Sequence, residues 1–162
     1  MIEILIVAGL VLVLVVFGSK FFRNKTAYVI KSETRKLSGL IQQTYNMAIA
    51  TNQTRRLVIN FDQASQDQHG THWVEARSDP QSKFNKVDRF SKFTLPKEVK
   101  FKDVYFPSLE KKIETDQAFI HFFSQGQAEP AILHVEDVQK AIYSIKIHPL
   151  TGRATIHAGY EQ

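Results

Sequence analysis

The sequence predicts an α+β protein: a long N-terminal α-helix, membrane-spanning in its first half, followed by a small antiparallel β-sheet or β-sandwich domain. An unbroken apolar run extends from Ile4 to Phe17, and a helical repeat of apolar residues continues to about residue 52. Apolar residues then recur at every second position. We therefore divide the chain into a transmembrane helix at 1–23, an amphipathic continuation at 24–53 and a soluble β domain at 54–162.

The apolar run has almost the length of a membrane anchor. From Ile4 the uncharged stretch is sixteen residues, or roughly 24 Å of helix against a bilayer core of about 30 Å. Lys20 and Arg23 can extend to the interface. A cleaved signal peptide is the alternative, but no basic region precedes the run and no small-x-small site follows it. The predicted anchor residues are Ile4, Leu5, Ile6, Val7, Leu10, Leu12, Leu14 and Phe17.

A single carboxylate, Glu3, lies near the N-terminal end of this run. A charge within hydrocarbon is costly and usually functional, so Glu3 is the first candidate site residue. The alternative is a carboxylate at the water interface that the N-terminus of the helix favours.

Beyond Arg23 an apolar stripe predicts that the same helix continues into the soluble part. Its members recur at spacings of three, four and seven: Ile30, Leu37, Ile41, Thr44 and Ala48. Asn52 is a suitable C-terminal stop. Short strands are then expected near 57–61, 72–77, 99–107, 118–123, 131–136, 141–148 and 153–157, with polar loops at 62–71 and 78–88. The segment from Pro149 to Gly152 is typical of a hairpin turn.

Composition argues against catalysis. The chain has no cysteine, no glycine-rich phosphate loop and no nucleophile motif. The spacing of His69 and His72 is weak for a metal site, and so is that of His134 and Glu136. We expect no enzyme activity, no cofactor and no metal.

The net charge of +5 is unevenly distributed. Residues 1–50 carry six basic side chains against two acidic ones, which suits lipid head groups. Residues 83–102 carry seven against two with interleaved phenylalanines, whereas residues 103–137 carry two against seven. Head-to-tail subunit contacts or a solvated face are the simpler interpretations, and DNA is the less favoured one. The candidate contact residues are Lys83, Lys86, Arg89 and Lys92.

Three segments carry a family resemblance. Residues 2–7, Ile-Glu-Ile-Leu-Ile-Val, resemble the inside of the type IV pilin N-terminal motif. Residues 48–61 resemble the helix-to-strand join of the GspH/FimT group of minor pseudopilins, the H proteins of type II secretion systems. Residues 123–130 (FSQGQAEP) and 147–153 (IHPLTGR) resemble the last two strand-turn segments of that group.

The resemblance implies a pilin-like fold and a structural subunit of a filament. Such a subunit is stored in the bacterial inner membrane with its C-terminal domain in the periplasm, and it assembles with other pseudopilins or pilins near the filament tip, where it can meet secreted cargo. Glu3 is expected to pair with the N-terminal amine of a neighbouring subunit. The alternatives are a FimT- or FimU-like minor pilin in pilus assembly or DNA uptake, and an unrelated single-pass protein with a cytoplasmic domain.

The family pattern begins before Met1. Its members carry a short basic leader, a glycine at the processing site and two further residues ahead of this position. Either the chain starts upstream of Met1, with a leader that is cleaved and an N-terminus that is methylated, or it is not processed. We expect the upstream start.

Overall fold

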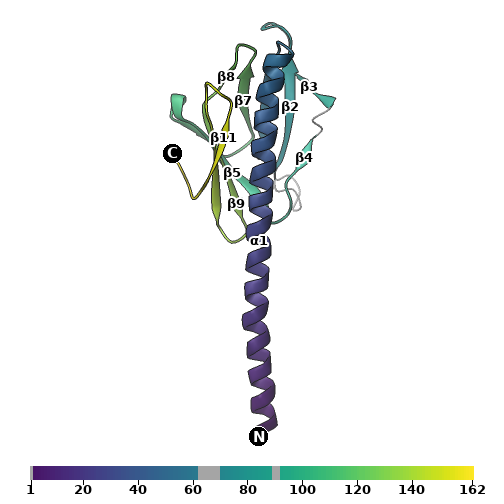
Figure 1. The fold of residues 1–162 in the computed structure, drawn as a ribbon, viewed down its shortest axis with the longest axis vertical. Helices are drawn as coiled ribbons and strands as arrows, with labels where there is room; N and C mark the ends of the chain where they lie inside the picture. The colour runs from purple at the N-terminus through teal and green to yellow at the C-terminus, as the bar shows by residue number, and fades with distance from the viewer. Residues whose placement is uncertain (1, 62–69, 89–91) are drawn as a thin grey trace.

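The computed structural model describes residues 2–61, 70–88 and 92–162; within the first helix it describes the side chains of residues 6, 7, 9–13 and 27 onward. The helix α1 (Ile2–Ala50) is unbroken, and its C-terminal half lies against the β domain while its N-terminal half projects from it (Figure 1). The predicted single helix is confirmed, with its end two residues earlier than expected.

The end of α1 is capped as the sequence predicts. Asn52 takes a left-handed conformation with φ of 50°, which stops the helix. The backbone N–H of Gln53 donates to the carbonyl of Ala48 at 3.1 Å, which satisfies one of the last helical acceptors.

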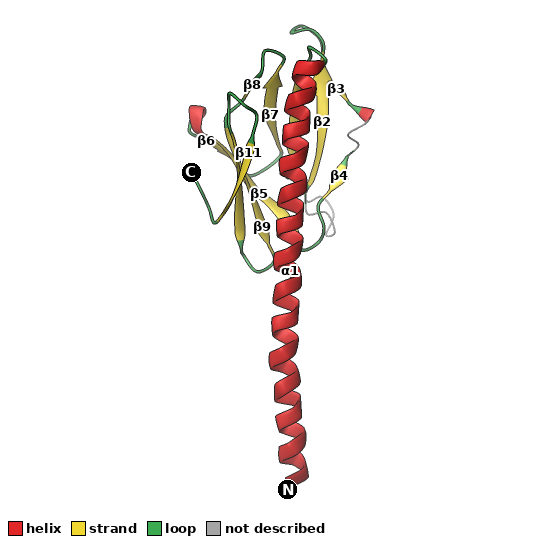
Figure 2. Cartoon of the chain, in the orientation of Figure 1, coloured by secondary structure: helices red, strands yellow, loops and turns green. Residues whose placement is uncertain are grey.

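The predicted stripe of α1 forms one side of the hydrophobic core. Ile30, Leu37, Ile41 and Ala48 are at most 1% exposed, because side chains three, four and seven positions apart share one helical face. This face contacts β1, β7, β9, β10 and β11. The helix therefore packs on both sheets (Figure 2).

The first sheet has the order β3-β2-β1-β7-β8, with β4 also paired to β2. Its longer strands alternate: Leu57, Ile59 and Ile120 face the core, while Arg56 and His121 lie on the outer face. The bounds are β1 (Thr54–Asn60), β2 (Thr71–Arg77), β3 (Asn85–Lys86), β4 (Phe93–Thr94), β7 (Gln117–Phe123) and β8 (Gln127–Ala128).

The second sheet has the order β11-β10-β9-β5-β6. A register shift between Phe101 and Asp103 makes a β-bulge in β5, so that Asp103 lies opposite His134. The bounds are β5 (Val99–Phe106), β6 (Lys111–Ile113), β9 (Ala131–Asp137), β10 (Ile142–Ile147) and β11 (Ala154–Ala158), with a short 3₁₀ helix η2 (Pro107–Leu109).

The seven longer predicted strands are confirmed, and four short ones were missed. β3 lies inside the predicted loop at 78–88, and β4, β6 and β8 were not expected. Two or three residues are too few to show a repeat of two, so only the pairing with a neighbouring strand defines them. Most of the predicted loop at 62–71 lies outside the described residues.

Within the described residues, no helical segment combines the length and the apolar character needed to cross a membrane. Most side chains of residues 1–23 lie outside the described residues, so the predicted span of this segment stays a prediction. Of the predicted anchor residues, Ile6, Val7, Leu10 and Leu12 are exposed by 59–67%. The side chains of the others lie outside the described residues: Ile4, Leu5, Leu14 and Phe17.

Candidate functional site

Glu3 is the second residue of α1. Its side chain lies outside the described residues, so its pairing with a partner amine stays a prediction. The first turn of a helix favours a carboxylate through the helix dipole, whichever role Glu3 has.

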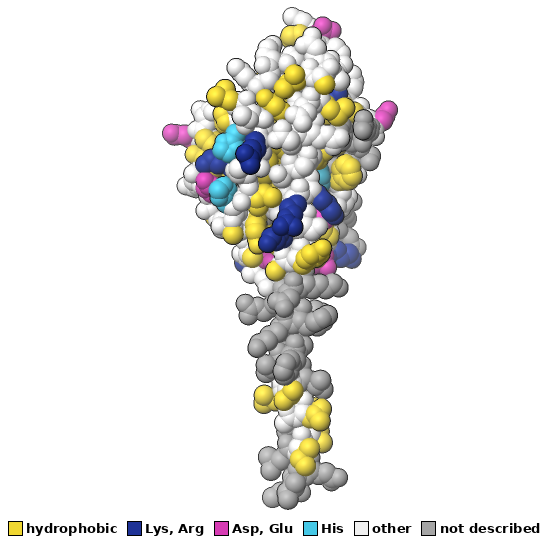
Figure 3. Space-filling model, in the orientation of Figure 1, with side chains coloured by type: hydrophobic (Ala, Val, Ile, Leu, Met, Phe, Trp, Pro, Cys, Tyr) yellow, Lys and Arg dark blue, Asp and Glu magenta, His cyan; other side chains and the backbone are white. Residues whose placement is uncertain are grey.

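The described part of the projecting helix exposes apolar side chains on all sides. Leu10, Val11, Leu12 and Val13 are 53–67% exposed, and Figure 3 shows hydrophobic side chains around this part of α1. Six such exposed residues lie between positions 6 and 13. A contiguous apolar surface of this kind marks a site of interaction with lipid or with other protein helices.

The predicted basic and aromatic contact surface lies on the outer side of the first sheet. The Nζ atoms of Lys86 and Lys92 lie 5.0 and 5.9 Å from the ring centre of Trp73. Trp73 is only 7% exposed, and its Nε1 donates to the carboxylate of Glu75 at 2.8 Å. The structure thus brings Lys86 and Lys92 together, but on a ring that is already covered.

A second aromatic cluster on the same side is also occupied. The guanidinium of Arg56 lies 4.1 Å from the ring centre of Phe84 and 4.2 Å from that of Phe119. Its Nε donates to Glu75 at 2.8 Å. Because these rings hold a cation of the protein itself, they do not present an open platform on which nucleic-acid bases could stack. Lys83 is exposed before β3, and Arg89 lies outside the described residues.

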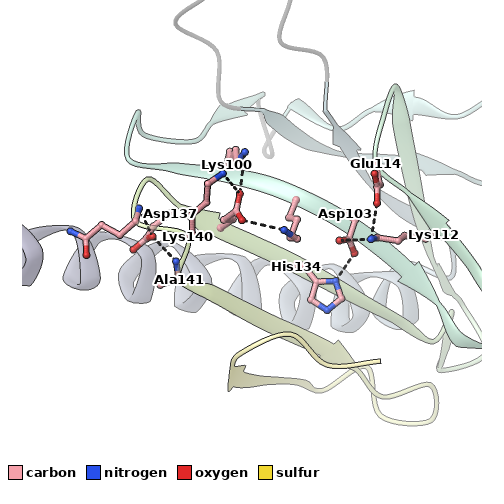
Figure 4. A network of polar contacts seen from close by, with 11 residues as sticks. Lys100, Asp103, Lys112, Glu114, His134, Asp137, Lys140 and Ala141 are labelled. Carbon is pink, nitrogen blue, oxygen red and sulfur yellow. Dashed lines mark hydrogen bonds and ion pairs between the residues drawn. The ribbon is translucent and has the colours of Figure 1, made fainter.

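A buried polar cluster on the outer side of the second sheet was not predicted. His134 and Asp103 have fully buried side chains, and their Nδ1 and Oδ1 atoms are 2.5 Å apart (Figure 4). Nε2 of His134 lies 2.8 Å from the backbone oxygen of Glu161, and the ring stacks on Tyr160 at 4.0 Å. The cluster therefore fixes the C-terminal residues against the sheet. The bulge that forms it cannot be read from a strand pattern.

The carboxylate of Glu136 binds three lysines. Lys100 and Lys102 lie 3.1 Å from it and Lys140 lies 3.5 Å from it. Burial alone would raise the pKa of Glu136, but hydrogen bonds from Lys100 and Lys102 hold that pKa below its ordinary value. The predicted charge asymmetry between 83–102 and 103–137 is therefore partly neutralised inside the domain.

The side chains of the second weak metal pair, His134 and Glu136, bind other groups of the protein. His134 binds Asp103 and the C-terminal backbone, while Glu136 binds lysines. His69 lies outside the described residues. Within the described residues, no group of three His, Asp or Glu side chains is placed to hold a metal ion.

Comparison with known proteins shows the fold. No protein-family model matches the sequence, and no curated protein is significantly similar to it. Among solved structures, the minor pseudopilin EpsH from the type 2 secretion system of Vibrio cholerae is similar, with a TM-score of 0.52 and 10% sequence identity over 81% of this chain and 96% of EpsH. At this identity the likeness shows a pilin-like fold, which confirms the predicted architecture of one long helix and antiparallel sheets.

Proposed function

We propose that this chain is a minor pseudopilin of a bacterial type II secretion system. It is a structural subunit without enzyme activity that assembles with other pseudopilins into a periplasmic filament and meets secreted cargo. The observation that carries the proposal is a single helix that runs from exposed apolar residues into the core of a β domain, in a fold shared with EpsH. A filament subunit needs both the helix, which packs with neighbouring subunits, and the β domain, which forms the outer surface that meets other proteins.

The exposed apolar helix gives the subunit two stable locations. Burial of apolar surface is favourable by about 25 cal/mol per Å², so residues 6–13 are stabilised either by the inner membrane or by the helices of neighbouring subunits. Transfer between the two replaces one apolar environment by another. The helix can therefore move from storage to filament without exposing this surface to water.

Glu3 then supplies the specific contact. In a helix bundle surrounded by lipid, a carboxylate needs a cationic partner, and the N-terminal amine of the adjacent subunit is the group at the right depth. Removing one side of a buried ion pair costs about 3 to 5 kcal/mol, because the other charge stays buried without a partner.

Substitution of Glu3 tests the proposal. Glu3→Leu is expected to leave membrane insertion intact, since a costly charge is removed from the apolar segment. Cross-linking to partner pseudopilins and secretion of a reporter protein should both fall, and Glu3→Asp should be intermediate because it keeps the charge but shortens its reach. Glu3→Leu protein that inserts, cross-links and secretes like wild type would show that the carboxylate is only interfacial.

Two alternative functions are separated by simple measurements. Reporter fusions after Gln162 that are active only in the cytoplasm would favour the unrelated single-pass protein. A pilus subunit that takes up DNA would bind duplex DNA with a steep salt dependence. The occupied rings of Trp73, Phe84 and Phe119 make the second alternative the weaker one.

A further inference from the structure

The end of the β domain where α1 leaves it carries several basic side chains, some on the helix and some around the β9–β10 turn. Tyr28 of α1 is exposed and Ile30 is fully buried, so the helix enters the domain within one turn. The turn between β9 and β10 lies beside the helix at this same end (Figure 1). We call the cations here the basic collar, formed by Lys31, Arg35, Lys36, Lys97, Lys100 and Lys140.

Two parts of the chain that are distant in sequence meet in the collar. The backbone N–H of Val138 donates to the carbonyl of Glu98 at 3.1 Å, which joins the β9–β10 turn to the segment before β5. A cavity of about 220 Å³ at this junction is lined by Lys97, Lys100 and Lys140, among other residues.

Two of the acids at this end are more deeply buried than the bases, and a third, Glu33, pairs with Lys36 at 2.6 Å. Glu136 and Asp137 are 4% and 3% exposed, and a side-chain oxygen of Asp137 accepts hydrogen bonds from the backbone of its own turn. By contrast, the side chains of Lys36 and Lys140 are 69% and 74% exposed. The six bases of the collar outnumber the acids at this end, so the net field that reaches solvent is positive. These acids are Glu33, Glu98, Glu136 and Asp137.

An apolar side chain, Val138, lines the same cavity as Lys97, Lys100 and Lys140. Val138 is 63% exposed at the tip of the β9–β10 turn, next to Lys140. Lysines around an exposed aliphatic residue suit a lipid interface, where the aliphatic group enters the head-group layer and the ammonium groups contact phosphates.

We propose that the basic collar is a contact surface for anionic phospholipid head groups, which orients the β domain on the membrane before assembly. The inference rests on the proposed membrane storage of residues 1–23. Ile30 lies seven positions after Arg23 in the helix, or about 10 Å along its axis. This distance is close to the Debye length of about 8 Å at physiological ionic strength. The collar thus stands within reach of the head groups.

The test uses the full chain in vesicles of phosphatidylcholine with or without phosphatidylglycerol. Because the chain has no cysteine, Gln139→Cys on the β9–β10 turn places one nitroxide at the collar, and Leu150→Cys places one at the opposite end of the domain. The accessibility of each nitroxide to a water-soluble nickel chelate is measured. Phosphatidylglycerol should lower the accessibility at 139 and leave that at 150 unchanged, and about 1 M salt should reverse the effect.

Matched charge variants identify the surface. Each lysine near an anionic membrane contributes roughly 1 kcal/mol, or about fivefold, so K31Q/K36Q/K140Q should lower the ratio of protected to accessible label by about a hundredfold. The control K83Q/K111Q/R153Q removes the same charge from exposed positions outside the collar and should keep the protection.

Three other outcomes would overturn the inference, and they distinguish failure of the collar contact from failure of the proposed function. Protein that floats with vesicles but shows equal accessibility at 139 in both lipids overturns the collar contact and leaves the proposed function intact. Protection that grows with protein density in phosphatidylcholine alone assigns the surface to a neighbouring copy and overturns it too. Protein that does not float with either vesicle overturns both proposals.

Discussion

His72 shows how one buried side chain sets a pH dependence. It is 7% exposed, it stacks on Phe93 at 5.5 Å, and its Nδ1 has no hydrogen-bond partner among the described residues. Burial lowers the pKa of His72 to about 4. The unfolded chain, with an ordinary histidine pKa of about 6.5, therefore binds a proton before the folded chain does. The contribution of His72 to the free energy of unfolding is full above about pH 6.5 and is lost as the pH falls toward 4.

Replacement of His72 should flatten this dependence. Between pH 7 and pH 5 the wild type should lose about 2 kcal/mol of stability through this residue, and His72→Phe should lose that much less. Urea unfolding at both pH values measures the difference. His157→Gln, which removes a half-exposed imidazole, is the control and should retain most of the wild-type loss; equal slopes for His72→Phe and wild type would contradict the prediction.

Gly152 is a position where the backbone conformation and a close contact both require glycine. Its φ is 58°, and an added Cβ would lie 2.1 Å from Cγ of Tyr45. Gly152→Ala should destabilise the chain by about 2 to 5 kcal/mol, from left-handed strain and overpacking together. In the control Gly126→Ala the φ is 83° and the nearest atoms are 3.7 Å away, so only the backbone cost remains. Thermal unfolding of both variants separates the two costs.

At the scale of elements, Tyr45 ties the C-terminal part of α1 to two turns. Its hydroxyl lies 3.0 Å from the carbonyl oxygen of Gly126 and 3.2 Å from that of Leu150. The first turn joins β7 to β8 in one sheet, and the second joins β10 to β11 in the other. The helix therefore holds the two sheets together through polar contacts as well as through its apolar stripe.

We expect the apolar stripe of α1 to contribute more to the stability of the fold than the hydrogen bonds of Tyr45 do. Leu37 is 1% exposed, so Leu37→Asp removes a core side chain and buries an unpaired charge. We expect a loss of about 2 to 5 kcal/mol, measured by chemical denaturation. Arg35→Asp on the exposed face of the same turn is the matched control, and surface changes of this kind are usually within about 0.5 kcal/mol. Equal stability of the two variants would show that this face is not core.

At the scale of the whole molecule, the sequence predicts those elements whose pattern lies within a single continuous segment of the chain. The helical stripe from Ile30 to Ala48, the stop at Asn52 and the longer strands each have a repeat or a terminal residue that is visible locally. The short strands β3 and β4 exist only as partners of β2. A repeat within one segment contains no information on that pairing.

The polar clusters were less predictable for the same reason. His134 and Glu136 share a strand and have only a weak metal spacing. Each binds side chains of β5, where a bulge shifts the register, and each has a further partner near the end of its own sheet or at the C-terminus. Likewise, Lys86 and Lys92 suggested an open surface, whereas β2 supplies the covered Trp73 beneath them. Sequence alone identifies the side chains, and the register between distant strands decides what they bind.

The continuity of α1 has a consequence for orientation. The helix is unbroken from Ile2 to Ala50, so its N-terminal half fixes the orientation of the β domain about the helix axis. Each added residue rotates the chain about that axis by about 100° and lengthens the helix by about 1.5 Å. The orientation of the β domain about the helix axis is therefore set by the number of residues between the apolar run and Ile30.

Insertions into the helix test this coupling. One alanine after Lys25 should turn the domain by about 100° with almost no change in height and should abolish cross-links between the domain and its neighbours. Seven alanines should restore the direction to within about 20° while raising the domain by roughly 10 Å. If the variant with a single insertion cross-links to the same neighbour positions as wild type, the helix acts as a flexible tether. If it does not, the helix is a rigid connection, and the number of residues in it determines how the domain is oriented in the filament.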